Sequence, residues 1–204
     1  MFDLPKTSEI RKPLHKKLIY EKYATELSGN KRERFDADIS RMIIINEISE
    51  ASVNVKATEA TSAIFVLQVE LKRKEYDDKN IIMISKLFRQ KLLIVLHYEN
   101  KYQLAIYETR LLKSDWKNEE DISLKLSGLN LGSVWDNFVT QVSGIHVQAG
   151  NTLVEQINVE AEKEKLRKQI ADLELRARKE VQSKKKFEMV QRLYKYQRML
   201  EDMT

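Results

Sequence analysis

The sequence predicts an α+β protein in which a small mixed β-sheet packs with helices and a long, charged helical arm follows. Two observations predict this fold class. Between residues 14 and 143, segments with strand alternation are interspersed with segments of helical spacing. From Asn151 to Thr204 there is no Gly or Pro, and a thin apolar stripe runs among charged residues. We therefore divide the chain into a core domain, residues 1–150, and an arm, residues 151–204.

The first forty residues predict an extended lead segment and two helices. Pro5 and Pro13 are the only prolines, and proline disfavours helix in the residue before it. Apolar residues at helical spacing then predict a helix over residues 14–27, ended by Ser28-Gly29-Asn30. A second helix is expected from about Lys31 to Ile39.

The middle of the chain predicts strands. The β-branched run 42–45 is typical of a buried strand or of the last turn of a buried helix, and periodicity does not separate the two. Residues 64–74 form the clearest strand, because Leu67, Val69 and Leu71 alternate with polar residues that face the other side. The second face of this strand is therefore wet or functional.

The rest of the core predicts a helix, a hairpin and a closing helix. Asp77-Asp78 is a suitable N-cap for a helix over residues 81–88. Strands over residues 92–98 and 102–109 are separated by a three-residue turn, which favours an antiparallel hairpin. Strand, helix, strand, strand is an α+β order that leaves the first crossover open to parallel pairing. The stretch 130–142 predicts a last helix whose apolar face closes the core.

The arm carries its apolar residues in two phases. The first stripe steps by four, three and four residues up to Ala177, and residues 182–186 interrupt it before a second stripe begins. This break favours a helical hairpin that turns near Ser183, whereas a parallel dimer through the arm uses the same stripe and stays open. The residues expected to bind a partner are Leu166, Ile170, Leu173, Phe187 and Leu193.

Positive charge is concentrated at both ends of the chain. The stretch 163–198 has thirteen Lys or Arg against five Asp or Glu, while residues 35–162 have fourteen against nineteen. Such a basic arm suits sequence-nonspecific contact with a DNA backbone, although a solvated helix face is the alternative interpretation. The aromatic residues Phe187, Tyr194 and Tyr196 are expected to pack the hairpin instead of stacking on bases. The candidate nucleic-acid-binding residues are Lys184, Lys185, Lys186, Arg176, Arg178 and Lys179.

Several classes of site are excluded by composition and motif. The chain has no Cys, and its three His residues are far apart, so no metal-binding spacing exists. The phosphate-binding glycine loops and the common hydrolase motifs are missing as well. We therefore expect no cofactor, and these motifs assign no residue a catalytic role. The chain contains no apolar run long enough to span a bilayer and no signal-peptide core in residues 1–12, which favours a cytoplasmic protein away from membranes.

One short motif suggests chemistry. Glu70-Leu71-Lys72 places a carboxylate and an ammonium on the same face of a strand. Nucleases of the PD-(D/E)xK type hold Mg²⁺ in this way, with a further acid upstream, for which Asp36 and Asp38 are the candidates. Glu and Lys also pair routinely on the wet face of a strand, so this nuclease function is the alternative to a structural role.

Four segments resemble one bacterial family. They are the opening Phe2-Asp3-Leu4-Pro5-Lys6-Thr7, the basic stretch 12–17, the strand Val69-Glu70-Leu71-Lys72-Arg73-Lys74 and the passage 84–96. Together they resemble domain-of-unknown-function family 4391. The resemblance implies a genomic setting beside DNA methyltransferases and helicases of restriction-type and phage-defence systems, and it implies no catalytic residues.

The sequence thus predicts a non-enzymatic accessory or assembly subunit of a bacterial DNA-modification or phage-defence complex. The expected partners are other protein subunits, such as a methyltransferase or helicase, and sequence-nonspecific DNA. The core would be a scaffold, and the arm would dock.

Overall fold

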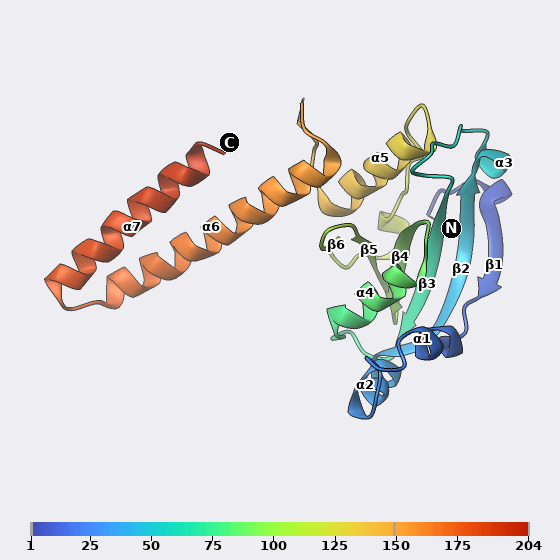
Figure 1. Ribbon diagram of the computed structural model, residues 1–204, viewed down its shortest axis with the longest axis horizontal. Coiled ribbons are helices and arrows are strands. Elements are labelled where there is room, and N and C mark those ends of the chain that lie inside the picture. Colours follow the sequence, from blue (N-terminus) through green and yellow to red (C-terminus); the bar gives the residue numbers. More distant parts are fainter. Residues whose placement is uncertain (1, 149, 204) are drawn as a thin grey trace. The chain divides into compact units, whose positions relative to one another are not determined.

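The computed structural model describes residues 2–148 and 150–203 and confirms the α+β class. The chain forms two compact units, Met1–Gly144 and Ile145–Thr204. The first unit holds a mixed six-stranded sheet with its helices, and the second holds two long helices (Figure 1).

The elements of the first unit follow one another in this order: η1 (Lys6–Ser8), β1 (Glu9–Pro13), α1 (Lys16–Lys22), α2 (Asn30–Asp38), β2 (Ile39–Ser49), α3 (Glu50–Val53), β3 (Ala63–Leu71), α4 (Asp78–Leu87), β4 (Lys91–Tyr98), β5 (Lys101–Tyr107), β6 (Leu111–Lys113), η2 (Glu119–Asp121) and α5 (Leu131–Ser143). The second unit contains α6 (Leu153–Lys179) and α7 (Ser183–Glu201).

The strands lie in sequence order from β1 to β6. Each neighbouring pair is antiparallel except β3 and β4, which run parallel and are joined by α4. The run 42–45 lies inside β2 and is therefore strand. The hairpin of β4 and β5 has the expected antiparallel pairing, and β3 ends at Leu71, three residues earlier than expected.

Helices cover both faces of the sheet. On one face, Leu67, Val69 and Leu71 of β3 pack in a core that also contains Ile19 of α1, Phe35 of α2 and Ile81 of α4, with further buried neighbours. The alternate residues Ile64 and Val66 are also fully buried, so the second face is covered too. Helix α5 supplies this cover with its buried face: Leu131, Val134, Trp135, Phe138, Val139 and Val142.

The helix starts follow the capping residues of the sequence. Asp77 caps α4 by accepting a 2.9 Å hydrogen bond from the Lys79 amide, and Asn130 caps α5 by accepting one of 2.9 Å from the Ser133 amide. Thr152 and Glu155 form a reciprocal capping box at the start of α6. These bonds satisfy amides that would otherwise lack a partner in the first turn.

In the second unit, α6 and α7 lie side by side and antiparallel, and the chain turns in residues 180–182 (Figure 1). The structure therefore has a hairpin where the stripe is interrupted. Leu166 and Ala177 of α6 are buried, whereas no residue of α7 is. Despite the 27 residues of α6, no helix of the described chain is both long and apolar enough to cross a bilayer.

Candidate functional site

A row of polar residues crosses four strands on the α5 side of the sheet. The strand register pairs Arg41 of β2 with Glu70 of β3, Glu70 with His97 of β4, and His97 with Tyr102 of β5. Glu70 and His97 stand near the carboxyl ends of the two parallel strands. Neighbouring residues in register share a face of the sheet, so these four side chains form one continuous row.

Direct contacts join the row. His97 Nδ1 lies 2.7 Å from Glu70 Oε2, and the Gln68 amide donates a 2.5 Å hydrogen bond to Glu70 Oε1. Arg41 Nη2 lies 4.0 Å from the same Oε1, and the His97 ring stacks on the Tyr102 ring with 4.3 Å between centroids. Both oxygens of Glu70 are thus engaged, and the carboxylate fixes the orientation of the imidazole.

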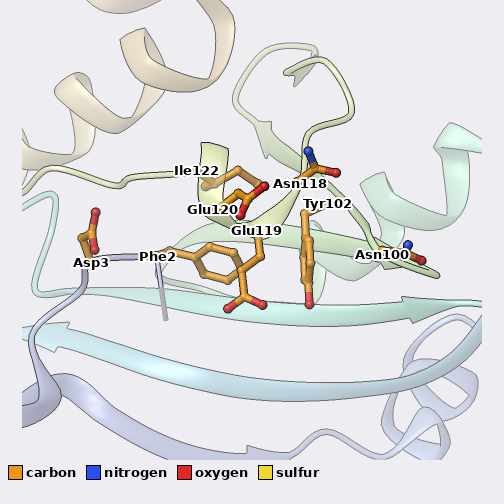
Figure 2. A pocket seen from close by; sticks show the side chains of 8 residues that line it. All are labelled: Phe2, Asp3, Asn100, Tyr102, Asn118, Glu119, Glu120 and Ile122. Atoms are coloured by element: carbon orange, nitrogen blue, oxygen red, sulfur yellow. The ribbon is translucent and has the colours of Figure 1, made fainter.

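The row ends at an open hollow of about 810 Å³ (Figure 2). Carboxylate, amide and aromatic side chains line it: Phe2, Asp3, Asn100, Tyr102, Asn118, Glu119, Glu120 and Ile122. They come from the start of the chain, from the β4–β5 turn, from β5 and from the segment around η2. The hollow therefore combines the carboxylates of Asp3, Glu119 and Glu120 with the aromatic rings of Phe2 and Tyr102.

Tyr102 connects the row with the hollow. Its ring meets Phe2 edge to face, with 5.5 Å between centroids. Phe2 is held there because its carbonyl accepts a 3.0 Å hydrogen bond from the Leu124 amide. Burial, followed by the negative charges of Glu119 and Glu70, raises the pKa of the Tyr102 phenol. The phenol therefore stays protonated at neutral pH and can donate a hydrogen bond.

The acids proposed upstream of Glu70 have other partners. Asp38 is fully buried and accepts hydrogen bonds from the Asp77 amide at 2.9 Å, from the Asn80 side chain at 2.8 Å and from Arg73. It thereby ties the end of α2 to the start of α4.

Asp36 accepts hydrogen bonds from Lys16 at 2.7 Å and from the Tyr20 hydroxyl at 2.5 Å. Lys72 follows the end of β3, where its side chain is exposed and its amide donates to the Asp38 carbonyl at 2.8 Å. The structure thus joins Glu70 to His97 and engages Asp36 and Asp38 elsewhere. Among the described residues, no three His, Asp or Glu side chains are placed to hold a metal ion.

The partner-binding residues expected in the arm divide into two groups. Leu166 is buried, and Ile170, Leu173 and Leu193 are half-buried along the line where α6 and α7 pack. Phe187 is 62% exposed and lies outside this seam. Four of the five residues therefore stabilise the hairpin itself, and Phe187 remains open to other molecules.

All six basic residues proposed for nucleic acid lie at the turn of the hairpin. Arg176, Arg178 and Lys179 occupy the last turn of α6, and Lys184, Lys185 and Lys186 occupy the first turn of α7. Each of them is exposed, and Arg176 pairs with Asp172 one turn away. We refer to these six residues as the basic tip.

Sequence reasoning found Glu70 but missed its neighbours His97 and Tyr102. They follow it by 27 and 32 positions, and only the register of three strands brings them together. A signal existed in the alternation of β4, because His97 falls on the same face as the apolar Leu93 and Val95. A polar residue that continues an apolar face marks the place where the covering helix ends.

Comparison with known proteins gives one match. The model of a family described as "Domain of unknown function (DUF4391)" matches residues 2–200. No curated protein and no solved structure matches the chain.

Proposed function

The chain belongs to the DUF4391 family, and we propose that it is a non-enzymatic accessory subunit of a bacterial DNA-modification or phage-defence complex, docking through its arm. The assignment to this kind of complex is supported by the genomic setting that the family resemblance implies. The partners would be other protein subunits, such as a DNA methyltransferase or helicase.

One observation carries the docking proposal: the hairpin leaves large apolar side chains in solvent. Leu175 on α6 is 58% exposed, and Val181 in the turn is 92% exposed. Full burial of one such side chain in an interface is worth about 1.5–3 kcal/mol. Because the four seam residues are already used within the hairpin, Leu175 and Val181 are the side chains that we assign to a protein partner.

The basic tip supports contact with a polyanion. The first turn of α7 contains Lys184, Lys185 and Lys186 and no acidic residue. The amino end of a helix carries partial positive charge, so three lysines there are electrostatically unfavourable by a few tenths of a kcal/mol each. A phosphate backbone beside this turn would make the electrostatic contribution of these lysines favourable. We propose that the tip contacts DNA phosphates without reading sequence.

The test is affinity purification of the tagged protein expressed from its operon, with nuclease treatment of the lysate. We expect co-elution of a methyltransferase or helicase that survives nuclease, and its loss in the double variant Leu175→Glu, Val181→Glu. Leu129→Glu is the matched control, because Leu129 is 96% exposed on the first unit. Recovery of the protein alone, or retention of partners by the double variant, contradicts docking through the arm.

The alternative nuclease function has its own test. It predicts Mg²⁺-dependent DNA cleavage that is lost in Glu70→Ala. Because Glu70 bonds to His97, the folded state of this variant must be verified by circular dichroism. Absence of cleavage by the purified protein, with or without its partners, leaves Glu70 as a residue that orients His97.

A further inference from the structure

Helix α7 carries two stripes of side chains, and only one of them faces α6. The inner stripe, Met189, Leu193, Tyr196 and Leu200, repeats at intervals of four, three and four and is half-buried. The outer stripe repeats at three, four, three and four, and all of its residues are exposed: Lys184, Phe187, Gln191, Tyr194 and Arg198. Residues at these intervals lie on one side of a helix.

Two aromatic rings dominate the outer stripe. Phe187 is 62% exposed and Tyr194 is 66% exposed, which corrects the expectation that they pack the hairpin; Tyr196 alone of the three is half-buried. Within the described chain, neither Phe187 nor Tyr194 makes a ring–ring or cation–ring contact. Seven residues of helix separate the two rings by about 10 Å. The fold therefore assigns these rings no internal role.

The charge around the rings selects the class of partner. The stretch 163–198 has an excess of eight positive charges, thirteen against five, so the same surface of a second copy would be repelled. An uncharged apolar groove would leave Lys184 and Arg198 without partners at the ends of the stripe. The ligand that offers both negative charges and flat apolar faces is a nucleic acid.

A single strand fits better than a duplex. In a duplex each base is stacked between its neighbours and its faces are hidden, so exposed rings gain nothing from it. In a single strand the bases can unstack and lie on aromatic side chains while cations track the phosphates. We infer that the outer stripe of α7 is a binding surface for single-stranded DNA, in which Phe187 and Tyr194 each stack on a base.

In this arrangement Lys184 and Arg198 contact phosphates at the two ends of the stripe, and Gln191 lies between the rings, where its amide can bond a base edge. The inference rests on the proposed phosphate contact of the basic tip. It adds base stacking and therefore a preference for unpaired DNA, as arises where a helicase or a modifying enzyme opens a duplex.

The test is fluorescence anisotropy of the purified full chain with a labelled oligothymidine and with a duplex of equal length. We expect tighter binding of the single strand, and a loss of about tenfold for that strand in each of Phe187→Ala and Tyr194→Ala. Duplex affinity should change less than about twofold in both, because duplex contact is made through phosphates. Met199→Ala is the matched control, since Met199 is an exposed residue of the same helix outside the stripe.

Further variants separate base stacking from a purely apolar contact and from a purely electrostatic one. Phe187→Leu keeps an apolar side chain that a protein groove would accept, yet it should bind the single strand as weakly as Phe187→Ala. Phe187→Trp should restore binding, with its indole fluorescence quenched when oligothymidine is added. Replacing Lys184, Lys185 and Lys186 by Gln should make the negative slope of log affinity against log salt concentration shallower by about two for the single strand.

Equal affinity for single strand and duplex, with no effect of the aromatic variants, overturns the stacking inference and leaves the phosphate contact of the tip intact. The inference is also overturned if Phe187→Leu binds the single strand as tightly as the natural protein does. If the purified protein binds neither DNA, both the inference and the phosphate contact fail, whereas the protein docking is decided separately by the nuclease-resistant co-elution.

Discussion

Helices α5 and α7 are both amphipathic, but they use their apolar residues differently. Six residues of α5 are buried, and Phe138 at its centre is fully covered. Helix α7 is longer and buries none, and its phenylalanine, Phe187, is mostly in solvent. Packing against the sheet of the first unit, which we call the sheet domain, thus accounts for every apolar residue of α5. The hairpin explains only the inner stripe of α7, and we propose that its outer residues meet a partner.

A similar contrast separates the charges of Asp38 and Glu70 from those near the basic tip. In the sheet domain, Asp38 is fully buried and Glu70 has both oxygens engaged. In the arm, the ion pair of Asp172 and Arg176 joins two side chains that are more than half exposed. Buried charges hold a structure together only when they are paired, whereas exposed charges add little to stability and remain available for binding.

The largest effect is expected from Phe138→Ala. Deleting a fully buried phenyl ring leaves a cavity between α5 and the sheet and should cost about 3–5 kcal/mol of unfolding free energy. Urea unfolding followed by circular dichroism measures it. Leu129→Ala, at a position 96% exposed, serves as control and should leave the midpoint unchanged. A loss below about 1 kcal/mol for Phe138→Ala would mean that α5 is not an integral part of the core.

A smaller loss is expected from Asp38→Ala. The substitution leaves the Asp77 amide and the Asn80 side chain without their acceptor, while Arg73, which is half exposed, can turn to water. Two unsatisfied groups correspond to about 2–3 kcal/mol. The matched variant in the arm, Asp172→Ala, should cost less than about 0.5 kcal/mol. Similar losses for the two variants in urea unfolding would remove the distinction between the two regions.

The sheet domain was largely predictable from sequence because its long elements have a period. The alternation of β3, the cap Asp77, the helix that begins near Asn130 and the hairpin of β4 and β5 all follow from the sequence pattern. Short elements were missed: β6 has three residues and α3 has four, too few for any periodicity. The pairing of β1 with β2 was also missed, because the five residues of β1 are all exposed and show no alternation.

The candidate sites were less predictable. Glu70 was found from its motif, but its partnership with His97 depends on the parallel register of β3 and β4, which no local pattern encodes. In the arm, the sequence pattern assigns Phe187 and Leu193 to one seam. A helix with apolar residues on two different sides does not reveal by its pattern which side meets the neighbouring helix. Only the packing of α6 against α7 separates them.

A pH-dependent effect of about 1 kcal/mol is expected at the junction of α1 and α2. Burial, together with the hydrogen bond to Asp36 and its negative charge, raises the pKa of Tyr20 to about 12. The folded-state pKa lies above the ordinary value of 10.0, so folding favours the protonated Tyr20 hydroxyl. The stabilisation that this hydroxyl gives the folded state is therefore complete below pH 10 and is lost as the pH rises through 12. Tyr20→Phe should therefore lower stability at pH 8 by about 1 kcal/mol and converge with the natural protein near pH 12.

Urea midpoints between pH 8 and pH 12 measure this convergence. Tyr194→Phe in the arm is the control, because the exposed Tyr194 hydroxyl has no hydrogen-bond partner within the described chain. The stability of this variant should match that of the natural protein between pH 8 and pH 12. A constant difference between Tyr20→Phe and the natural protein across this range would show that the hydroxyl acts by packing and not through Asp36.

The smallest effect is expected from Phe187→Ala, which repeats in α7 the substitution made at Phe138 in α5. Because the Phe187 ring is already 62% in water, its removal forms no cavity, and the unfolding free energy should change by less than about 0.5 kcal/mol. Alanine also has the higher helix propensity, which offsets part of any lost contact. Thermal unfolding followed by circular dichroism at 222 nm measures the change. A loss comparable with that of Phe138→Ala would assign Phe187 to the hairpin and remove the reason to look for its partner elsewhere.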